Sequence, residues 1–259
     1  MPIVLGPHHA RLSSVRELKT PRGRREQGRF AIEGPTLIAE ARRSGLEPRE
    51  LYGTPAALAG NPALVPSETP VFSVPEHAFA RLSDVETPSG LLAVLDLPEG
   101  ALEAVLARPG PVLLLAGVND PGNAGTLLRS AEAFGAAGVL FGRGGVDPYS
   151  PKVVRAAMGS LFRLPLAVVD AEPLLAAAAA AGRPVVAADT TGDDLDAAML
   201  AADAIVAIGN ERRGVRDWLP RWDQAVRIPQ SGLTESLNAA VAGSIIFYEL
   251  ARLRRASVK

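Results

Sequence analysis

The sequence contains no cysteine and only three histidines, His8, His9 and His77, in 259 residues. Without thiols the chain cannot form disulfides, thiolate zinc sites, iron–sulfur clusters or a cysteine nucleophile. Three histidines also leave little for an imidazole zinc site or an imidazole base. These absences exclude most metal-dependent and hydrolytic chemistry, and we expect no metal site.

The sequence also lacks any stretch of 18 apolar residues without a charge, the length that a membrane-spanning helix needs. Residues 1–14 do not show the charged start, long apolar core and small-residue cleavage site of a secretory signal. We therefore expect a soluble, cytoplasmic protein with no membrane partner. Its length suffices for one large domain or two ordinary domains, each with its own core.

Charge is balanced overall, with 27 basic and 28 acidic residues, but it is unevenly placed. Residues 1–50 carry 10 Lys or Arg against 6 Asp or Glu, residues 211–259 carry 9 against 5, and the remaining 160 residues carry 8 against 17. A polyanionic partner should therefore meet the two ends of the chain. Residues 11–29 hold seven basic and two acidic side chains, a pattern typical either of a basic arm or of a solvated helix followed by a turn.

Short apolar runs alternate with helical patterns beyond this basic segment. The expected strands lie at 29–34, 49–53, 71–74 and 91–97, and the expected helices at 35–45 and 75–85. This alternation predicts a small α/β sandwich. Residues 98–110 are bounded by Pro and Gly, and we expect a linker with one short helix there.

A second alternating series occupies residues 111–259. Its expected strands lie at 111–117, 138–142, 164–170, 184–189, 204–210 and 225–229, and its expected helices at 121–135, 150–162, 172–182 and 234–255. Continuous apolar strands joined by helices predict a parallel sheet covered on both faces. Ligands are then expected beyond the carboxyl ends of the strands.

Three segments at predicted strand ends concentrate Gly and polar side chains. The first, residues 119–125 (N-D-P-G-N-A-G), opens a helix that carries Arg129; Asn119 or Asp120 can cap this helix, but a cap does not explain the further Asn and Arg. The second is residues 208–214 (I-G-N-E-R-R-G), and the third is residues 228–238 (I-P-Q-S-G-L-T-E-S-L-N). Turn and cap geometry explains only part of each segment.

Other patterns favour ordinary structural explanations. No phosphate-binding loop or dinucleotide fingerprint is present. Asp189, Asp193 and Asp194 suit a magnesium ion, but we favour a solvated acidic loop that caps a following helix. Tyr52, Phe72 and Phe79 suit base stacking, but in a small domain we favour core packing.

Taken in order, the three segments resemble the three motifs of SpoU (TrmH-type) RNA ribose 2′-O-methyltransferases. Residues 29–97 resemble the small RNA-binding domain that precedes the catalytic domain in many members. The resemblance implies an α/β fold: a small N-terminal α/β RNA-binding sandwich, then a parallel-sheet α/β/α SPOUT domain with a C-terminal trefoil knot. It divides the chain into a basic N-terminal arm (1–28), an RNA substrate-binding domain (29–97), a linker (98–110) and a SPOUT methyltransferase domain (111–259).

The resemblance also implies S-adenosylmethionine as cofactor, RNA as substrate and a homodimer with the first motif helix and the last helix near its two-fold axis. The catalytic residues that it implies are Asn123, Arg129, Glu211, Ser236 and Asn238. The cofactor-binding residues that it implies are Ala188, Asp189, Thr190, Gly209, Asn210, Glu211, Gly214, Ile228, Gln230, Ser236, Leu237 and Asn238.

In the implied reaction a ribose hydroxyl attacks a sulfonium methyl group in line. Because arginine is a poor base, we expect Arg129 to fix the neighbouring phosphate and lower the pKa of the hydroxyl. Asn123 and Ser236 would orient the hydroxyl and Arg129, while Glu211 and Asn238 hold the geometry. We expect ribosomal RNA rather than tRNA as substrate; a non-catalytic RNA-binding module and a nucleotide-dependent oxidoreductase are the rival interpretations.

Overall fold

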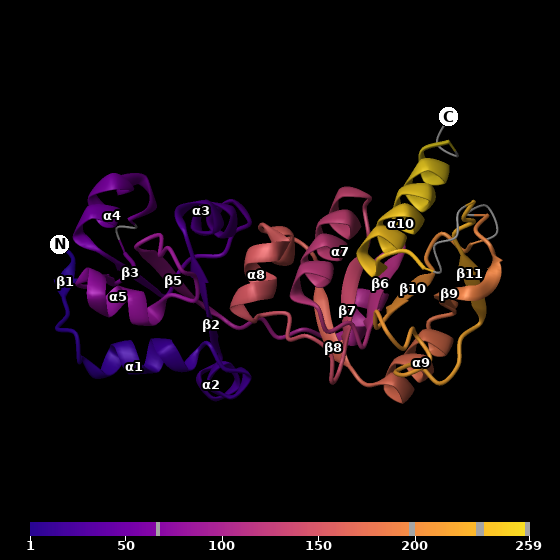
Figure 1. Ribbon diagram of the computed structural model, residues 1–259, viewed down its shortest axis with the longest axis horizontal. Helices are drawn as coiled ribbons and strands as arrows, with labels where there is room; N and C mark the ends of the chain where they lie inside the picture. The colour runs from indigo at the N-terminus through magenta and orange to yellow at the C-terminus, as the bar shows by residue number, and fades with distance from the viewer. Residues whose placement is uncertain (66–67, 197–199, 232–235, 257–259) are drawn as a thin grey trace. The chain divides into compact units, whose positions relative to one another are not determined.

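The computed structural model describes residues 1–65, 68–196, 200–231 and 236–256, and it shows an α/β protein (Figure 1). The chain forms two compact units. Unit 1 consists of Met1–Pro98 and Tyr149–Phe162, and unit 2 of Glu99–Pro148 and Arg163–Lys259. The chain thus leaves unit 2 once, between two of its strands, and returns to it.

Unit 1 is built on a five-stranded mixed sheet in the order β1-β4-β3-β5-β2. The β1, β4 and β3 strands are parallel, and β5 is antiparallel to both β3 and β2. The strands are β1 (Ile3–Val4), β2 (Arg29–Glu33), β3 (Glu50–Gly53), β4 (Val71–Ser73) and β5 (Leu91–Asp96). The helices are α1 (Ala10–Glu17), α2 (Pro21–Gln27), α3 (Pro35–Arg43), α4 (Pro55–Gly60), α5 (Glu76–Leu82) and α8 (Pro151–Ala157), with 3-10 turns at Pro62–Leu64 and Ser160–Phe162.

The basic segment near the N-terminus folds as helices α1 and α2 and not as an extended arm. Leu12, Val15 and Leu18 are buried in the core of unit 1, so this segment packs on the unit through a few apolar side chains among many charged ones. Helix α2 begins at the cap residue Thr20, whose hydroxyl accepts the N–H of Gly23 at 3.0 Å. The structure thus differs from both interpretations of the charge pattern, because the segment forms two helices that pack through buried side chains and is neither an arm nor one solvated helix followed by a turn.

The three aromatic residues considered for base stacking lie in this same core. Tyr52, Phe72 and Phe79 are all buried, which confirms the core interpretation. Helix α8 also belongs to unit 1: it packs against β2, and the rings of Tyr149 and Phe30 lie 4.9 Å apart. The sequence pattern had grouped α8 with the second series of strands, because neighbouring elements in a chain usually share a domain.

Unit 2 contains a six-stranded sheet in which every neighbouring pair is parallel, as predicted. The strand order is β11-β9-β10-β6-β7-β8. The strands are β6 (Val112–Ala116), β7 (Gly138–Gly142), β8 (Leu166–Val169), β9 (Val185–Asp194), β10 (Ile205–Gly209) and β11 (Gln224–Arg227). The helices are α6 (Leu102–Leu106), α7 (Pro121–Ala133), α9 (Ala171–Ala180) and α10 (Ala239–Ala256).

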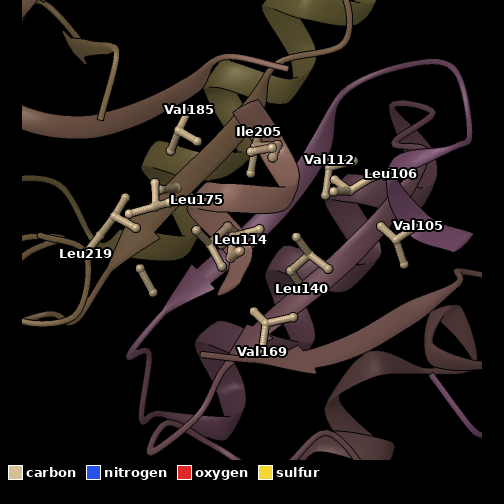
Figure 2. Packing of buried hydrophobic residues seen from close by; sticks show 14 of the residues in the cluster. Val105, Leu106, Val112, Leu114, Leu140, Val169, Leu175, Val185, Ile205 and Leu219 are labelled. Carbon is tan, nitrogen blue, oxygen red and sulfur yellow. The ribbon is translucent and has the colours of Figure 1, made fainter. Parts of the chain in front are cut away.

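Helices cover both faces of this sheet. One face packs on α6 and α9, and Figure 2 shows Leu114, Leu140 and Ile205 meeting Leu175 and Val105 there. Alternate residues of each strand face the other side, which α7 and α10 cover (Figure 1). Both faces of the sheet are therefore shielded from solvent, and the polar residues of interest lie at the ends of the strands.

The last helix differs from its prediction at its start. It was expected from residue 234, but α10 begins at Ala239, and residues 232–235 lie outside the described residues. Among the helices that the structure describes, none is long and apolar enough to cross a membrane.

Candidate functional site

The first two polar segments lie together at the carboxyl edge of the unit 2 sheet. Strands β6 and β10 are parallel neighbours with Gly209 paired to Ala116, so the loops that follow both strands leave the sheet side by side. The side-chain amide of Asn210 donates to the carbonyl oxygen of Gly117 at 3.3 Å and ties one loop to the other. Segments 93 residues apart thus form one surface.

The loop after β10 is closed by its own backbone. The N–H of Asn210 donates to the carbonyl of Gly214 at 3.2 Å, and the N–H of Gly214 donates to the carbonyl of Asn210 at 2.8 Å. A Cβ atom on Gly209 would lie 2.2 Å from the carbonyl carbon of Gly214, and Gly214 itself has φ +69°. Both glycines are therefore required by the shape of this loop.

A chain of side-chain hydrogen bonds joins the three segments. The Nδ2 of Asn123 donates to Oε1 of Glu211 at 2.7 Å, and its Oδ1 accepts from Nδ2 of Asn238 at 3.0 Å. Asn123 is thus engaged at both ends of its amide, once by the second segment and once by the third. This orientation is fixed by its partners.

Two of the site's polar residues also cap helices. Oδ1 of Asp120 accepts the N–H of Asn123 at 2.7 Å at the start of α7. Oδ1 of Asn238 accepts the N–H groups of Ala240 and Val241 at 2.9 and 3.2 Å at the start of α10. Capping satisfies backbone donors that have no partner within the helix, so it fixes where each helix begins relative to the site.

Two cavities adjoin at this edge. The larger has a volume of about 1020 Å³, and its lining includes every residue expected to bind the cofactor. The smaller, of about 730 Å³, is lined by Asn119, Asp120, Pro121, Asn123, Asn210, Glu211, Arg212 and Asn238. The two linings have Asn210, Glu211, Arg212 and Asn238 in common.

The structure brings together four of the five expected catalytic residues and leaves one apart. Asn123, Glu211, Ser236 and Asn238 line one or both cavities. Arg129 is exposed, and among the described residues it lines neither cavity. It follows Asn123 by six residues, about 1.7 turns of helix, so it projects from a different side of α7.

Asp189 is the most buried carboxylate in the lining of the larger cavity, with 12% of its side chain exposed. Burial alone would raise its pKa, but hydrogen bonds from Thr191 and the positive charge of Arg216 outweigh burial and lower the pKa below its ordinary value. The guanidinium of Arg216, 3.5 Å from Asp189, stacks on Trp222 with 4.7 Å to the ring centre. Asp189 is therefore held in place at the cavity by Thr191 and Arg216.

The sequence did not single out Arg212, which lines both cavities. Its position directly after Glu211 in a strand-end loop was the available signal.

Asp194 and Arg227 also line the larger cavity and pair with each other at 2.6 Å. The larger cavity has apolar side chains beside its amides and charged groups, whereas amides and charged groups dominate the lining of the smaller cavity. Such a site suits the binding of two reactants side by side.

Known proteins resemble this chain over nearly its full length. Residues 110–248 match the SpoU rRNA Methylase family, and residues 10–93 match the MRM3-like substrate binding domain. The 23S rRNA (guanosine(2553)-2′-O)-methyltransferase of Bacillus subtilis (strain 168) is 32% identical over 241 residues, which cover 91% of this chain and 93% of that protein.

Two solved structures are similar throughout. The SpoU methyltransferase AviRb from Streptomyces viridochromogenes, in complex with AdoMet, matches with TM-score 0.84 and 30% identity over 96% of this chain and 99% of that one. An AdoMet-bound rRNA methyltransferase from Sinorhizobium meliloti matches with TM-score 0.81 and 27% identity over 98% of each chain.

Proposed function

Because this chain belongs to the SpoU rRNA methylase family, we propose that it transfers the methyl group of S-adenosylmethionine to a ribose 2′-hydroxyl of RNA. The observation that supports this most is the pair of adjoining cavities whose linings share Asn210, Glu211, Arg212 and Asn238. Methyl transfer requires a donor and an acceptor aligned at short distance. Two cavities with common walls meet that requirement.

The larger cavity fits the cofactor in size and in chemistry. Its volume of about 1020 Å³ is ample for a nucleoside joined to an amino acid. Ile228, Leu237 and Ile246 offer apolar contact for an adenine ring. When bound, S-adenosylmethionine supplies a methyl group activated by its positively charged sulfur.

The smaller cavity is the side for the target nucleotide. Glu211 and Asn238 fix the amide of Asn123 from both ends, so its dipole needs no reorganisation when charge develops on a nearby hydroxyl oxygen. We assign Asn123 and Ser236 to orienting the hydroxyl, and Glu211 and Asn238 to holding that arrangement. These residues position the acceptor hydroxyl, and none of them is assigned the role of a base that removes its proton.

Arg129 acts on the phosphate beside the target ribose. The positive charge of a guanidinium lowers the pKa of the hydroxyl and leaves a phosphate oxygen to accept the proton. Because Arg129 is outside both cavity linings of its own protomer, we assign it to the site of a partner copy in a homodimer. Val241 and Tyr248 on α10 are 47% and 45% exposed, which suits an interface formed by α7 and α10.

Unit 1 contributes phosphate contacts. It contains the whole of the segment that matches a substrate binding domain, and a cavity of about 90 Å³ on it is lined by His8, His9, Arg16 and Arg81 among others. Such contacts position an RNA without reading its sequence. Ribosomal RNA is the substrate that we favour, since the relative acting on 23S rRNA aligns with 91% of this chain. The trefoil knot and the cytoplasmic location stay predictions.

The test is transfer of labelled methyl from S-adenosylmethionine to fractionated RNA by the purified protein. We expect label in ribosomal RNA and little in tRNA. Label in tRNA alone would replace the substrate but keep the reaction. Absence of label in every RNA fraction, together with no cofactor binding by calorimetry, would favour the non-catalytic module, and binding of a nicotinamide nucleotide would favour the oxidoreductase.

A further inference from the structure

The smaller cavity has an unfavourable charge for an RNA substrate, except at one residue. Its lining includes two carboxylates, Asp120 and Glu211, and a single cationic side chain, Arg212. Both carboxylates accept hydrogen bonds from Asn123, each at 2.7 Å, so they belong to the framework of the site. An RNA phosphate entering here is repelled by these two carboxylates and needs a counter-charge.

The guanidinium of Arg212 is available for that purpose. Three other arginines of the region each pair with an aspartate: Arg213 with Asp217 at 3.2 Å, Arg216 with Asp189 at 3.5 Å and Arg227 with Asp194 at 2.6 Å. For Arg212 the structure records no side-chain partner within the ranges that it describes. Its charge is therefore not neutralised by a neighbouring carboxylate.

The backbone of Arg212 is anchored although its side chain is exposed. Oδ1 of Asn210 accepts the N–H of Arg212 at 2.9 Å and the N–H of Arg213 at 3.3 Å. The same Asn210 is tied to Gly117 and to Gly214, as described for the loop after β10. The backbone from which the guanidinium projects is therefore fixed relative to both cavities.

We infer that Arg212 binds one of the two phosphates that flank the target ribose, and is a further substrate-positioning residue of the reaction. The inference rests on the proposed function, in which Arg129 of the partner copy takes the other phosphate. A guanidinium presents paired donors that match two phosphate oxygens. Among the described residues, Arg212 is the one cationic side chain in the lining of the smaller cavity, whereas Arg213 and Arg227 in the lining of the larger cavity are each paired with an aspartate.

The test measures RNA affinity and its salt dependence for Arg212→Ala and Arg212→Lys. Arg212→Ala should raise the KM for RNA about tenfold or more and reduce the slope of log affinity against log salt by about one. Arg212→Lys should recover part of the affinity and the salt slope, because it keeps the charge but not the paired donors. Affinity for S-adenosylmethionine, measured by calorimetry, should stay within about twofold and also shows that the variants fold.

The matched control is Arg221→Ala, which removes an exposed guanidinium that pairs with Glu172 and lines neither cavity. It should leave the KM for RNA and the salt slope unchanged. An Arg212→Ala variant with wild-type RNA affinity and salt slope would overturn the inference, as would a loss confined to cofactor affinity. Failure of the wild-type protein to methylate any RNA would instead overturn the proposed function.

Discussion

At the scale of residues, the site depends on side chains that each make more than one contact. Asn238 caps α10 with its side-chain oxygen and donates to Asn123 with its side-chain nitrogen, and Asn123 in turn donates to Glu211. Their site roles were predicted from the resemblance of the three segments to the SpoU motifs, and for Asn123 also because a helix cap does not explain the further Asn and Arg of the first segment. The side of α7 on which Arg129 lies could not be read from the motif, because spacing along a helix does not show what the helix faces.

Replacing Asn123 with Asp should abolish most activity while leaving the fold intact. The new carboxylate would lie where the amide nitrogen now donates to Glu211 at 2.7 Å, so two like charges would face each other. We expect kcat to fall at least about 100-fold, the range seen when an oriented polar group is lost from a reaction site.

The measurement is single-turnover methyl transfer, with circular dichroism and thermal melting as the check on folding. Asn61→Ala is the control, because its amide donates only to the carbonyl of Ala57 in the recorded contacts. An Asn123→Asp variant with wild-type kcat would remove the hydrogen-bond chain from the reaction.

At the scale of elements, the apolar runs predicted the strands from β2 to β11, because buried strands have a continuous apolar pattern. The short strand β1 (Ile3–Val4) was not predicted, and β9 continues to Asp194, five residues beyond its predicted end. The helices α1 and α2 were ambiguous, since only Leu12, Val15 and Leu18 mark their buried side among many charges. The start of α10 was placed too early because Thr234 is also a suitable cap. The cap that the structure shows is Asn238.

The loop from Gly209 to Gly214 is the element whose shape most directly forms the common cavity wall. Gly209→Ala would place a Cβ atom 2.2 Å from the backbone of Gly214, where no flexible side chain can move away. We expect a loss of about 1–3 kcal/mol in unfolding free energy and a loss of cofactor binding.

Denaturant unfolding and calorimetric titration with S-adenosylmethionine measure both effects. Gly60→Ala is the control, because a Cβ atom there meets nothing within 4 Å. Unchanged cofactor affinity in Gly209→Ala would show that the loop does not shape the binding site.

At the scale of the whole molecule, the proposed role of Arg129 requires two copies of the chain for each complete site. Arg129 and Asn123 lie on one helix, yet only Asn123 lines a cavity of its own protomer. Neither composition nor periodicity could predict that Asn123 and Arg129 serve the sites of different copies, since this depends on how two copies meet.

Mixing two inactive variants tests whether Arg129 completes the site of a partner copy. Arg129→Ala and Asn123→Ala should each be inactive alone, but a mixed dimer has one site with both residues intact. After exchange of subunits about a quarter of wild-type activity should return, because half of the dimers are mixed and each has one working site of two. Recovery of no activity, with mixed dimers demonstrated by tagged purification, would place Arg129 in its own protomer's site.

The central claim is that the three strand-end segments hold a methyl donor against a ribose oxygen. Mass spectrometry of nucleosides from RNA that the enzyme has modified tests it most directly. We predict a 2′-O-methylated nucleoside that forms at least about 100-fold more slowly when Asn123→Asp replaces the wild-type protein. Methyl groups found on a base would contradict the account.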